Sequence, residues 1–158
     1  MTVHVIAVGR VRDPAIRAAC DDYAKRSRRL LSLQVREVAD AGRAGPTPAV
    51  ARRLEGRRIQ DVLPDPCMTV ALTRPGKAVS SDELARRLGR WRDAGRDVAF
   101  VVGGPFGLAD ELIADAALTL SLSAMTLPHE LARLVLLEQL YRAGTILRGT
   151  PYHKGRSP

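Results

Sequence analysis

The sequence predicts an α/β fold with a mainly parallel sheet flanked by helices. Short apolar runs bounded by glycine or proline alternate with longer stretches whose apolar residues recur at helical spacing. Such alternation is typical of parallel sheets, in which helices connect the strands. A chain of 158 residues with 46% hydrophobic residues can bury one sizeable core. We expect one domain over residues 1–158, ending in a tail over 148–158.

The first strand and helix follow from their boundaries. Residues 2–8 are mostly apolar and precede Gly9, which predicts a short strand. Asp13 and Pro14 then supply an N-cap and a first helical residue for a helix that extends to about residue 31. A second strand is expected over 33–38.

A loop rich in glycine and proline, residues 42–48, separates this part from the next helix. Residues 49–63 return to helical spacing. The apolar positions of this helix are Val50, Leu54, Ile59 and Val62, and its outward positions are Arg52, Arg53, Arg57 and Arg58. A buried strand over 68–72 and a turn over 74–77 are expected next.

The remaining elements complete an expected set of five strands and five helices. Ser80 and Glu83 form a capping-box pattern for a helix that ends at Gly95. Strands are expected over 98–102 and 118–122, each followed by a loop and a helix. Pro128 opens the last helix, which extends to about residue 147.

The last two strands both end in loops with little side-chain bulk. The first loop is Gly-Gly-Pro-Phe-Gly at 103–107, and the second, at 123–129, is small and apolar. Neighbouring parallel strands that end in this way form a ligand crevice at their carboxyl ends. The second loop is suited to wrap a flat heterocycle, and its alternative role is to pack between helices. Neither GxGxxG nor GxxxxGK[ST] occurs in the sequence.

Composition narrows the class of partner. There are 25 Lys and Arg against 17 Asp and Glu, a net charge of +8. Such an excess of positive charge favours binding to a polyanionic partner. Alternatively, the charge serves only to keep the protein in solution. Cys20 and Cys67 lack any CxxC or metal-ligand spacing, so we expect reduced thiols in a cytoplasmic protein without a bound metal. No signal peptide or membrane-spanning run is evident.

The terminal helix is apolar on more than one face. Its apolar residues are Leu131, Leu134, Val135, Leu136, Leu137, Leu140, Tyr141, Ile146 and Leu147. A helix of this kind must be buried on several sides. We expect it to form a subunit interface in a homodimer as well as part of the core, and the alternative is a fully internal helix.

Several motifs together resemble one family, the RlmH-type methyltransferases of the SPOUT class, which act on large-subunit ribosomal RNA. The segments that carry the resemblance are Gly103-Gly104 with Gly107, Leu120-Ser121-Leu122-Ser123-Ala124-Met125-Thr126-Leu127-Pro128-His129, Glu138-Gln139-Leu140-Tyr141-Arg142-Ala143 and Pro151-Tyr152-His153. Residues 5–9 and 72–77 agree as well, so the match spans the chain in order. Two features depart from it: the loop at 42–48 is atypically rich in proline and glycine, and the tail continues past His153 by five residues.

The resemblance implies a fold, a cofactor, a partner and a substrate. It implies a deep trefoil knot near the C-terminus and a homodimer whose active site is completed across the interface. It implies S-adenosylmethionine bound by Leu72, Gly103, Leu122, Ser123, Ala124, Met125, Thr126 and Leu127. The implied reaction is methylation of N3 of a pseudouridine in 23S rRNA, on assembled ribosomes.

The chemistry of that reaction points to the tail. N3 lies between two carbonyl groups, so its proton must leave before or during methyl transfer, and a base or a stabilising cation is needed. We expect His153, Tyr152 and Arg142 to fill these roles. Arg142 follows Glu138 by four residues, so a helical ion pair is an equal alternative. His129 at a helix start is expected to be structural or part of the cofactor loop.

Two other functions stay open at this stage. One is a non-enzymatic RNA-binding module that uses the basic helices. The other is a different SPOUT reaction, on ribose 2′-oxygens or on tRNA, against which the tail at Tyr152 and His153 argues. The sequence does not identify the group that accepts the N3 proton, the roles of His129 and Glu138 or of the residues after His153, or whether free RNA is a substrate.

Overall fold

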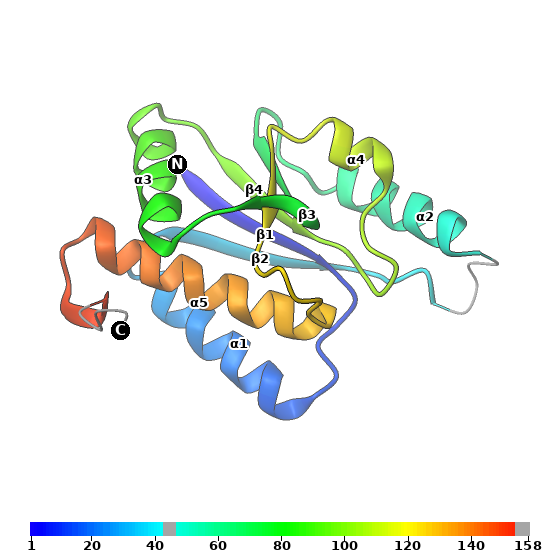
Figure 1. The fold of residues 1–158 in the computed structure, drawn as a ribbon, viewed down its shortest axis with the longest axis horizontal. Helices are drawn as coiled ribbons and strands as arrows, with labels where there is room; N and C mark the ends of the chain where they lie inside the picture. Colours follow the sequence, from blue (N-terminus) through cyan, green and yellow to red (C-terminus); the bar gives the residue numbers. More distant parts are fainter. Residues whose placement is uncertain (43–46, 154–158) are drawn as a thin grey trace.

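A computed structural model describes residues 1–42 and 47–153, with only the backbone described at His153. In the described part, five strands form one sheet in the order β2-β1-β4-β3-β5, and every neighbouring pair is parallel (Figure 1). The strands are β1 (Thr2–Val8), β2 (Ser32–Val38), β3 (Met68–Ala78), β4 (Val98–Val102) and β5 (Leu118–Ser121). The predicted α/β class with a parallel sheet is confirmed.

Helices cover both faces of the sheet (Figure 1). One face packs against α1 (Pro14–Ser27), α3 (Ser81–Asp93) and α5 (His129–Leu147), and the other against α2 (Pro48–Gln60) and α4 (Asp110–Ala114). A short 3-10 helix, η2 (Pro151–His153), follows α5. Because helices lie on both faces, the central strands are apolar on both: Val5 joins one core and Ile6 the other.

The helix starts form as the sequence predicts. The Asp13 carboxylate accepts hydrogen bonds from the amides of Ala15 and Ile16, at 2.8 and 3.0 Å. The Ser80 hydroxyl accepts one from the Glu83 amide at 3.1 Å. The capping box is only half formed, because the Glu83 carboxylate pairs with Arg87 at 2.7 Å.

The predicted turn at 74–77 is wrong, because β3 continues through it to Ala78. Leu72 and Lys77 both pair with Leu120 on β5, so the residues between them form a large irregularity in the strand. Gly76 makes this possible: a Cβ there would lie 2.7 Å from the Leu120 carbonyl carbon. Pro75 and Gly76 therefore mark a distortion within the strand. Their sequence pattern resembles that of a turn, which is why a turn was predicted.

The buried face of α2 also differs from the prediction. Among the expected apolar positions Ile59 is buried, whereas Val50 and Leu54 are only half-buried. The buried positions Ala51, Glu55 and Ile59 are spaced by four residues. The helix is therefore rotated so that a carboxylate, Glu55, faces the protein interior at 3% exposure.

The trefoil knot stays a prediction, because strand order and pairing do not define how one loop threads another. Part of the predicted loop at 42–48 and the tail beyond His153 lie outside the described residues.

We predict that His4 makes the protein less stable in acid. His4 is 5% exposed within β1, and neither ring nitrogen has a hydrogen-bond partner among the described residues. Burial lowers the pKa of His4, Asp97 acts against this shift, and Arg36 adds to it. An unfolded histidine has a pKa of about 6.5, so the unfolded state binds more protons as the pH falls below that value.

The free energy of unfolding, measured with urea between pH 8 and pH 5, should therefore decrease as the pH falls below about 6.5. His4→Leu should make this decrease shallower, because it removes the group that titrates. An identical pH dependence in wild type and His4→Leu would contradict the assignment.

Candidate functional site

A cavity of about 540 Å³ lies at the carboxyl ends of β3, β4 and β5. The loops that follow β4 and β5 form most of its wall, with the start of α5 and the irregular part of β3. All the residues predicted to bind a cofactor line it except Ala124; these are Leu72, Gly103, Leu122, Ser123, Met125, Thr126 and Leu127. The predicted crevice is thus present, but β4 and β5 are not neighbours as expected, because β3 lies between them in the sheet. The binding of a ligand there stays a prediction.

The loop after β4 is a tight turn closed on itself. Gly107 has a φ of +83° and its amide donates to the Gly104 carbonyl at 3.0 Å. A Cβ at Gly103 would lie 2.5 Å from the Gly107 carbonyl carbon. The packing of the loop backbone therefore requires glycine at position 103, whether or not a ligand is bound.

The loop after β5 is held by short polar contacts. The Ser121 hydroxyl donates to the Ser123 carbonyl at 3.0 Å, and the Ser123 hydroxyl accepts from the Met125 amide at 2.9 Å. Arg74 from β3 donates to the Thr126 hydroxyl at 3.2 Å. These bonds shape a loop whose Met125 side chain is 76% exposed, so apolar packing contributes little to its conformation.

The lining suits an elongated ligand with one flat apolar end and one charged end. Leu72, Val102, Leu120, Leu122 and Leu127 supply apolar walls. The hydroxyl groups come from serine and threonine side chains, and the Arg74 guanidinium supplies a positive charge for an anionic group. Few polar groups in an apolar cleft of this size are typical of cofactor sites.

The residues predicted to be catalytic lie elsewhere in the chain. Tyr152 follows the C-terminal end of α5, whereas the cavity lies at the N-terminal end of the same helix (Figure 1). The Tyr152 ring packs edge-on against Tyr141 with centroids 4.6 Å apart, and the Arg142 guanidinium lies 5.1 Å from the Tyr152 ring centroid. The side chain of His153 lies outside the described residues.

Glu138 connects these tail residues. Arg142 pairs with it at 2.7 Å, so the helical ion pair expected as an alternative is present. The Tyr152 hydroxyl donates to the same carboxylate at 3.3 Å and lies 3.5 Å from the Tyr23 hydroxyl. The hydrogen bond to Glu138 raises the pKa of Arg142. Burial raises the pKa of Tyr152, and its contacts with Tyr23 and Glu138 add to the shift, so its phenol keeps its proton at neutral pH.

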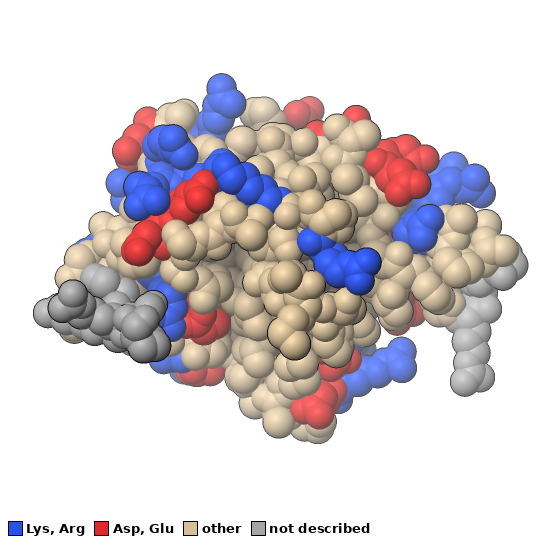
Figure 2. Space-filling model, viewed as in Figure 1, with Lys and Arg blue, Asp and Glu red and all other residues tan. Residues whose placement is uncertain are grey.

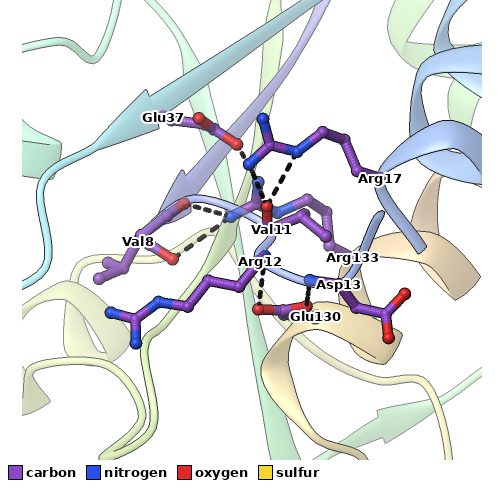
Figure 3. Close-up of polar contacts among 9 residues, drawn as sticks. Val8, Val11, Arg12, Asp13, Arg17, Glu37, Glu130 and Arg133 are labelled. Atoms are coloured by element: carbon purple, nitrogen blue, oxygen red, sulfur yellow. Dashed lines mark hydrogen bonds and ion pairs between the residues drawn. The ribbon is translucent and has the colours of Figure 1, made fainter. Parts of the chain in front are cut away.

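A buried arginine fixes the start of α5 to the sheet (Figure 3). Arg133 is 3% exposed and donates to the carbonyls of Val8, at 3.3 Å, and Gly9, at 2.6 Å. It also pairs with Glu37 on β2 at 2.5 Å. Glu130, one turn earlier, accepts from the amide of Arg12 at 2.9 Å. Two side chains of α5 therefore hold the loop that follows β1.

Comparison with known proteins identifies the family. A family described as "Predicted SPOUT methyltransferase" matches residues 1–153. The chain is 44% identical over 156 residues to "Ribosomal RNA large subunit methyltransferase H" of Thioalkalivibrio sulfidiphilus, a match that covers 98% of this chain and 99% of that protein. This chain belongs to the SPOUT methyltransferase family. It is a methyltransferase, and the resemblance seen in the sequence motifs is confirmed.

A second relative supports the family, and a solved structure supports the fold. A protein of the same name from Anaeromyxobacter dehalogenans is 46% identical over 154 residues. The match covers 98% of this chain and 100% of that protein. Among solved structures, a methylase family protein from Neisseria gonorrhoeae aligns with a TM-score of 0.51 at 17% identity, over 89% of this chain and 81% of that one. At that identity the likeness supports the fold alone.

Two residues that line the cavity were missed in the sequence. Thr73 and Arg74 line the cavity because β3 continues past Leu72, and a turn had been expected there. His129, which was expected to be structural or part of the cofactor loop, lines the cavity from the first residue of α5. In the described ranges, no helix meets the length and apolarity needed to cross a membrane, and no group of three potential ligands is placed to hold a metal.

We predict that Arg133→Gln destabilises the protein by about 2–3 kcal/mol, because buried carbonyl groups lose a charged donor. Urea denaturation measures the change. Arg86→Gln, at an exposed position of α3, is the matched control and should change stability by less than about 0.5 kcal/mol. Equal stability of the two variants would contradict the role given to Arg133.

Proposed function

We propose that this methyltransferase uses S-adenosylmethionine to methylate N3 of a pseudouridine in 23S rRNA, acting as a homodimer on assembled ribosomes. The observation that carries the proposal is the near full-length similarity to relatives named ribosomal RNA large subunit methyltransferase H. The cavity at the carboxyl ends of β3, β4 and β5 supports it.

The residues of the cavity fit S-adenosylmethionine. Leu122 and Leu127 belong to the apolar wall that suits an adenine ring, and backbone groups of the same loop can hydrogen-bond the ring edge. Arg74 suits the carboxylate of the methionine part. When bound, the cofactor supplies a methyl group that is already activated as a sulfonium. The protein then has to align the acceptor and manage its proton.

The tail residues suit that second task. The Tyr152 phenol keeps its proton, so it can turn from Glu138 to donate to a carbonyl of the base and help to stabilise the anion that forms when N3 loses its proton. Arg142, which packs against the Tyr152 ring and pairs with Glu138, places a guanidinium beside the same group. His153, which follows Tyr152 in the tail, is expected to belong to the same group of active-site residues.

Two copies of the chain are needed to bring the tail to a cavity. The 19 residues of α5 separate the two groups of residues, a distance of about 28 Å at the rise of an α-helix. Apolar side chains of α5 such as Leu134, Val135 and Ile146 are only partly buried in one chain. Figure 2 shows few charged residues over the first turns of α5 and the loop before it. These features favour a homodimer that pairs through α5.

The basic composition supports an RNA substrate. The net charge of +8 favours phosphate contacts, which position RNA without selecting a sequence. Exposed arginines such as Arg53 and Arg57 on α2 are available for this role.

The experiment that tests the function is mass mapping of ribosomal RNA. Ribosomes from cells that lack this modification would be incubated with the purified protein and S-adenosylmethionine, and the RNA would be digested and analysed. We expect one new methyl group on the base of a pseudouridine in 23S rRNA. A methyl group on a ribose or in tRNA, or no methylation at all, would overturn the proposal.

We predict that Ser123→Ala weakens binding of S-adenosylmethionine by about 2- to 10-fold, since one neutral hydrogen bond that shapes the loop is lost. Isothermal titration calorimetry measures the affinity. Ser32→Ala, at an exposed position of β2, is the control and should bind as the wild type does. Unchanged affinity in Ser123→Ala would contradict the placement of the cofactor in this loop.

A further inference from the structure

A second cavity, of about 350 Å³, lies beside the first, at the carboxyl end of β1. Pro105 and His129 line both cavities, so the two are neighbours. The loop after β1, the buried face of α2 and the start of α5 form its other walls. The proposed cofactor site does not use this second cavity.

Glu55 gives the second cavity a hydrogen-bond acceptor that has no partner in the described part of the chain. Its side chain lines the cavity from the buried face of α2. Its Oε1 accepts from the Ala41 amide at 2.9 Å, but its Oε2 is buried and has no partner among the described residues. A Cβ at Gly104, which lines the first cavity, would lie 3.1 Å from that Oε2. The free oxygen therefore lies at the boundary between the two cavities.

The other carboxylates of the second cavity are already engaged. Glu130 accepts from the amides of Arg12 and Asp13, at 2.9 and 3.3 Å (Figure 3). Asp40 pairs with the Arg12 side chain at 3.6 Å. A buried polar atom without a partner is unfavourable, so Glu55 Oε2 is the group for which a ligand donor would be most stabilising.

The mouth of the cavity carries groups that suit a nucleotide. Phe106 is 50% exposed and lines the cavity, which leaves an aromatic face available for a base to stack on. Arg10 and Arg12 line it as well and are exposed, so they can contact phosphate groups.

We propose that the second cavity holds the target base and that Glu55 selects pseudouridine over uridine. This inference rests on the proposed function. During transfer N3 must face the methyl donor in the first cavity, so the other ring N–H, at N1, is the one left to donate to Glu55. Uridine is bonded to its ribose through N1 and has no N–H there. A site that presents a buried acceptor disfavours a substrate that lacks the matching donor.

The test is Glu55→Gln. Its amide oxygen can still accept from Ala41, but the unpartnered acceptor becomes an NH2 donor that opposes the N1–H group. Methyl transfer would be measured as kcat/KM on ribosomes that carry pseudouridine and on ribosomes that carry uridine at the same position. Glu111→Gln, exposed on α4, is the matched control. Calorimetry with S-adenosylmethionine and thermal unfolding would be measured for each variant.

We expect Glu55→Gln to lower kcat/KM on pseudouridine ribosomes by about 10- to 100-fold, with cofactor affinity unchanged and with little effect on any transfer to uridine. The discrimination between the two substrates should shrink accordingly. Wild-type kcat/KM on pseudouridine ribosomes in Glu55→Gln, or equal losses on both substrates, would overturn the inference. Failure of the wild type to methylate pseudouridine ribosomes would instead overturn the proposed function.

Phe106 provides a second variant that leaves the buried carboxylate intact. Phe106→Ala should raise KM for ribosomes by about 5- to 100-fold through the lost stacking, and Phe106→Trp should retain a KM near that of the wild type. If Glu55→Gln does not fold, this pair decides the place of the base: equal KM values in Phe106→Ala and wild type would exclude the second cavity.

Discussion

The buried guanidinium of Arg133 is the contact on which both cavities depend. It lies in the second turn of α5 and ties that helix to the Val8 and Gly9 carbonyls at the end of β1 and to Glu37 on β2. Because α5 begins directly after the loop at 122–128, the same contact fixes that loop against the sheet. The first turns of α5 are thereby held between a cavity suited to the cofactor and a cavity suited to the base. Such a buried charge is tolerated because its two terminal nitrogens have hydrogen-bond and ion-pair partners, whereas its Nε has none among the described residues.

The length of α5 sets the second constraint on function. Its first turn lines both cavities, and its last turns carry Glu138, Arg142 and the aromatic contacts of Tyr152. A rigid helix cannot bring its two ends together, so one chain cannot assemble all these groups around one substrate. In the proposed homodimer, each tail would instead serve the cavity of its partner. The polar cluster at Glu138 holds Tyr152 and Arg142 in place, which favours a preformed surface.

Much of this arrangement was predictable from the sequence, because the strands, the helix caps and the bare loops have strong local signals. The limits of β1 and β4 agree with the prediction, and so do the N-caps at Asp13 and Ser80. Two features could not be predicted from the sequence. The course of β3 past Leu72 depends on the close approach of another strand at Gly76, which local sequence does not encode. The buried position of Glu55 follows from the rotation of α2 and contradicts the usual preference of carboxylates for solvent.

Complementation between two inactive variants is the most direct test of a site shared by two chains. Ser123→Trp would fill the cavity of its own chain, and Tyr152→Ala would remove the tail side chain that the proposed site takes from the partner. When the two variants are mixed in equal amounts and exchange subunits, half of the dimers contain one chain of each variant. In such a dimer, one of the two sites is intact. The mixture should therefore recover about a quarter of the wild-type rate of methyl transfer. A mixture with proven subunit exchange that stays as inactive as either variant alone would contradict the shared site.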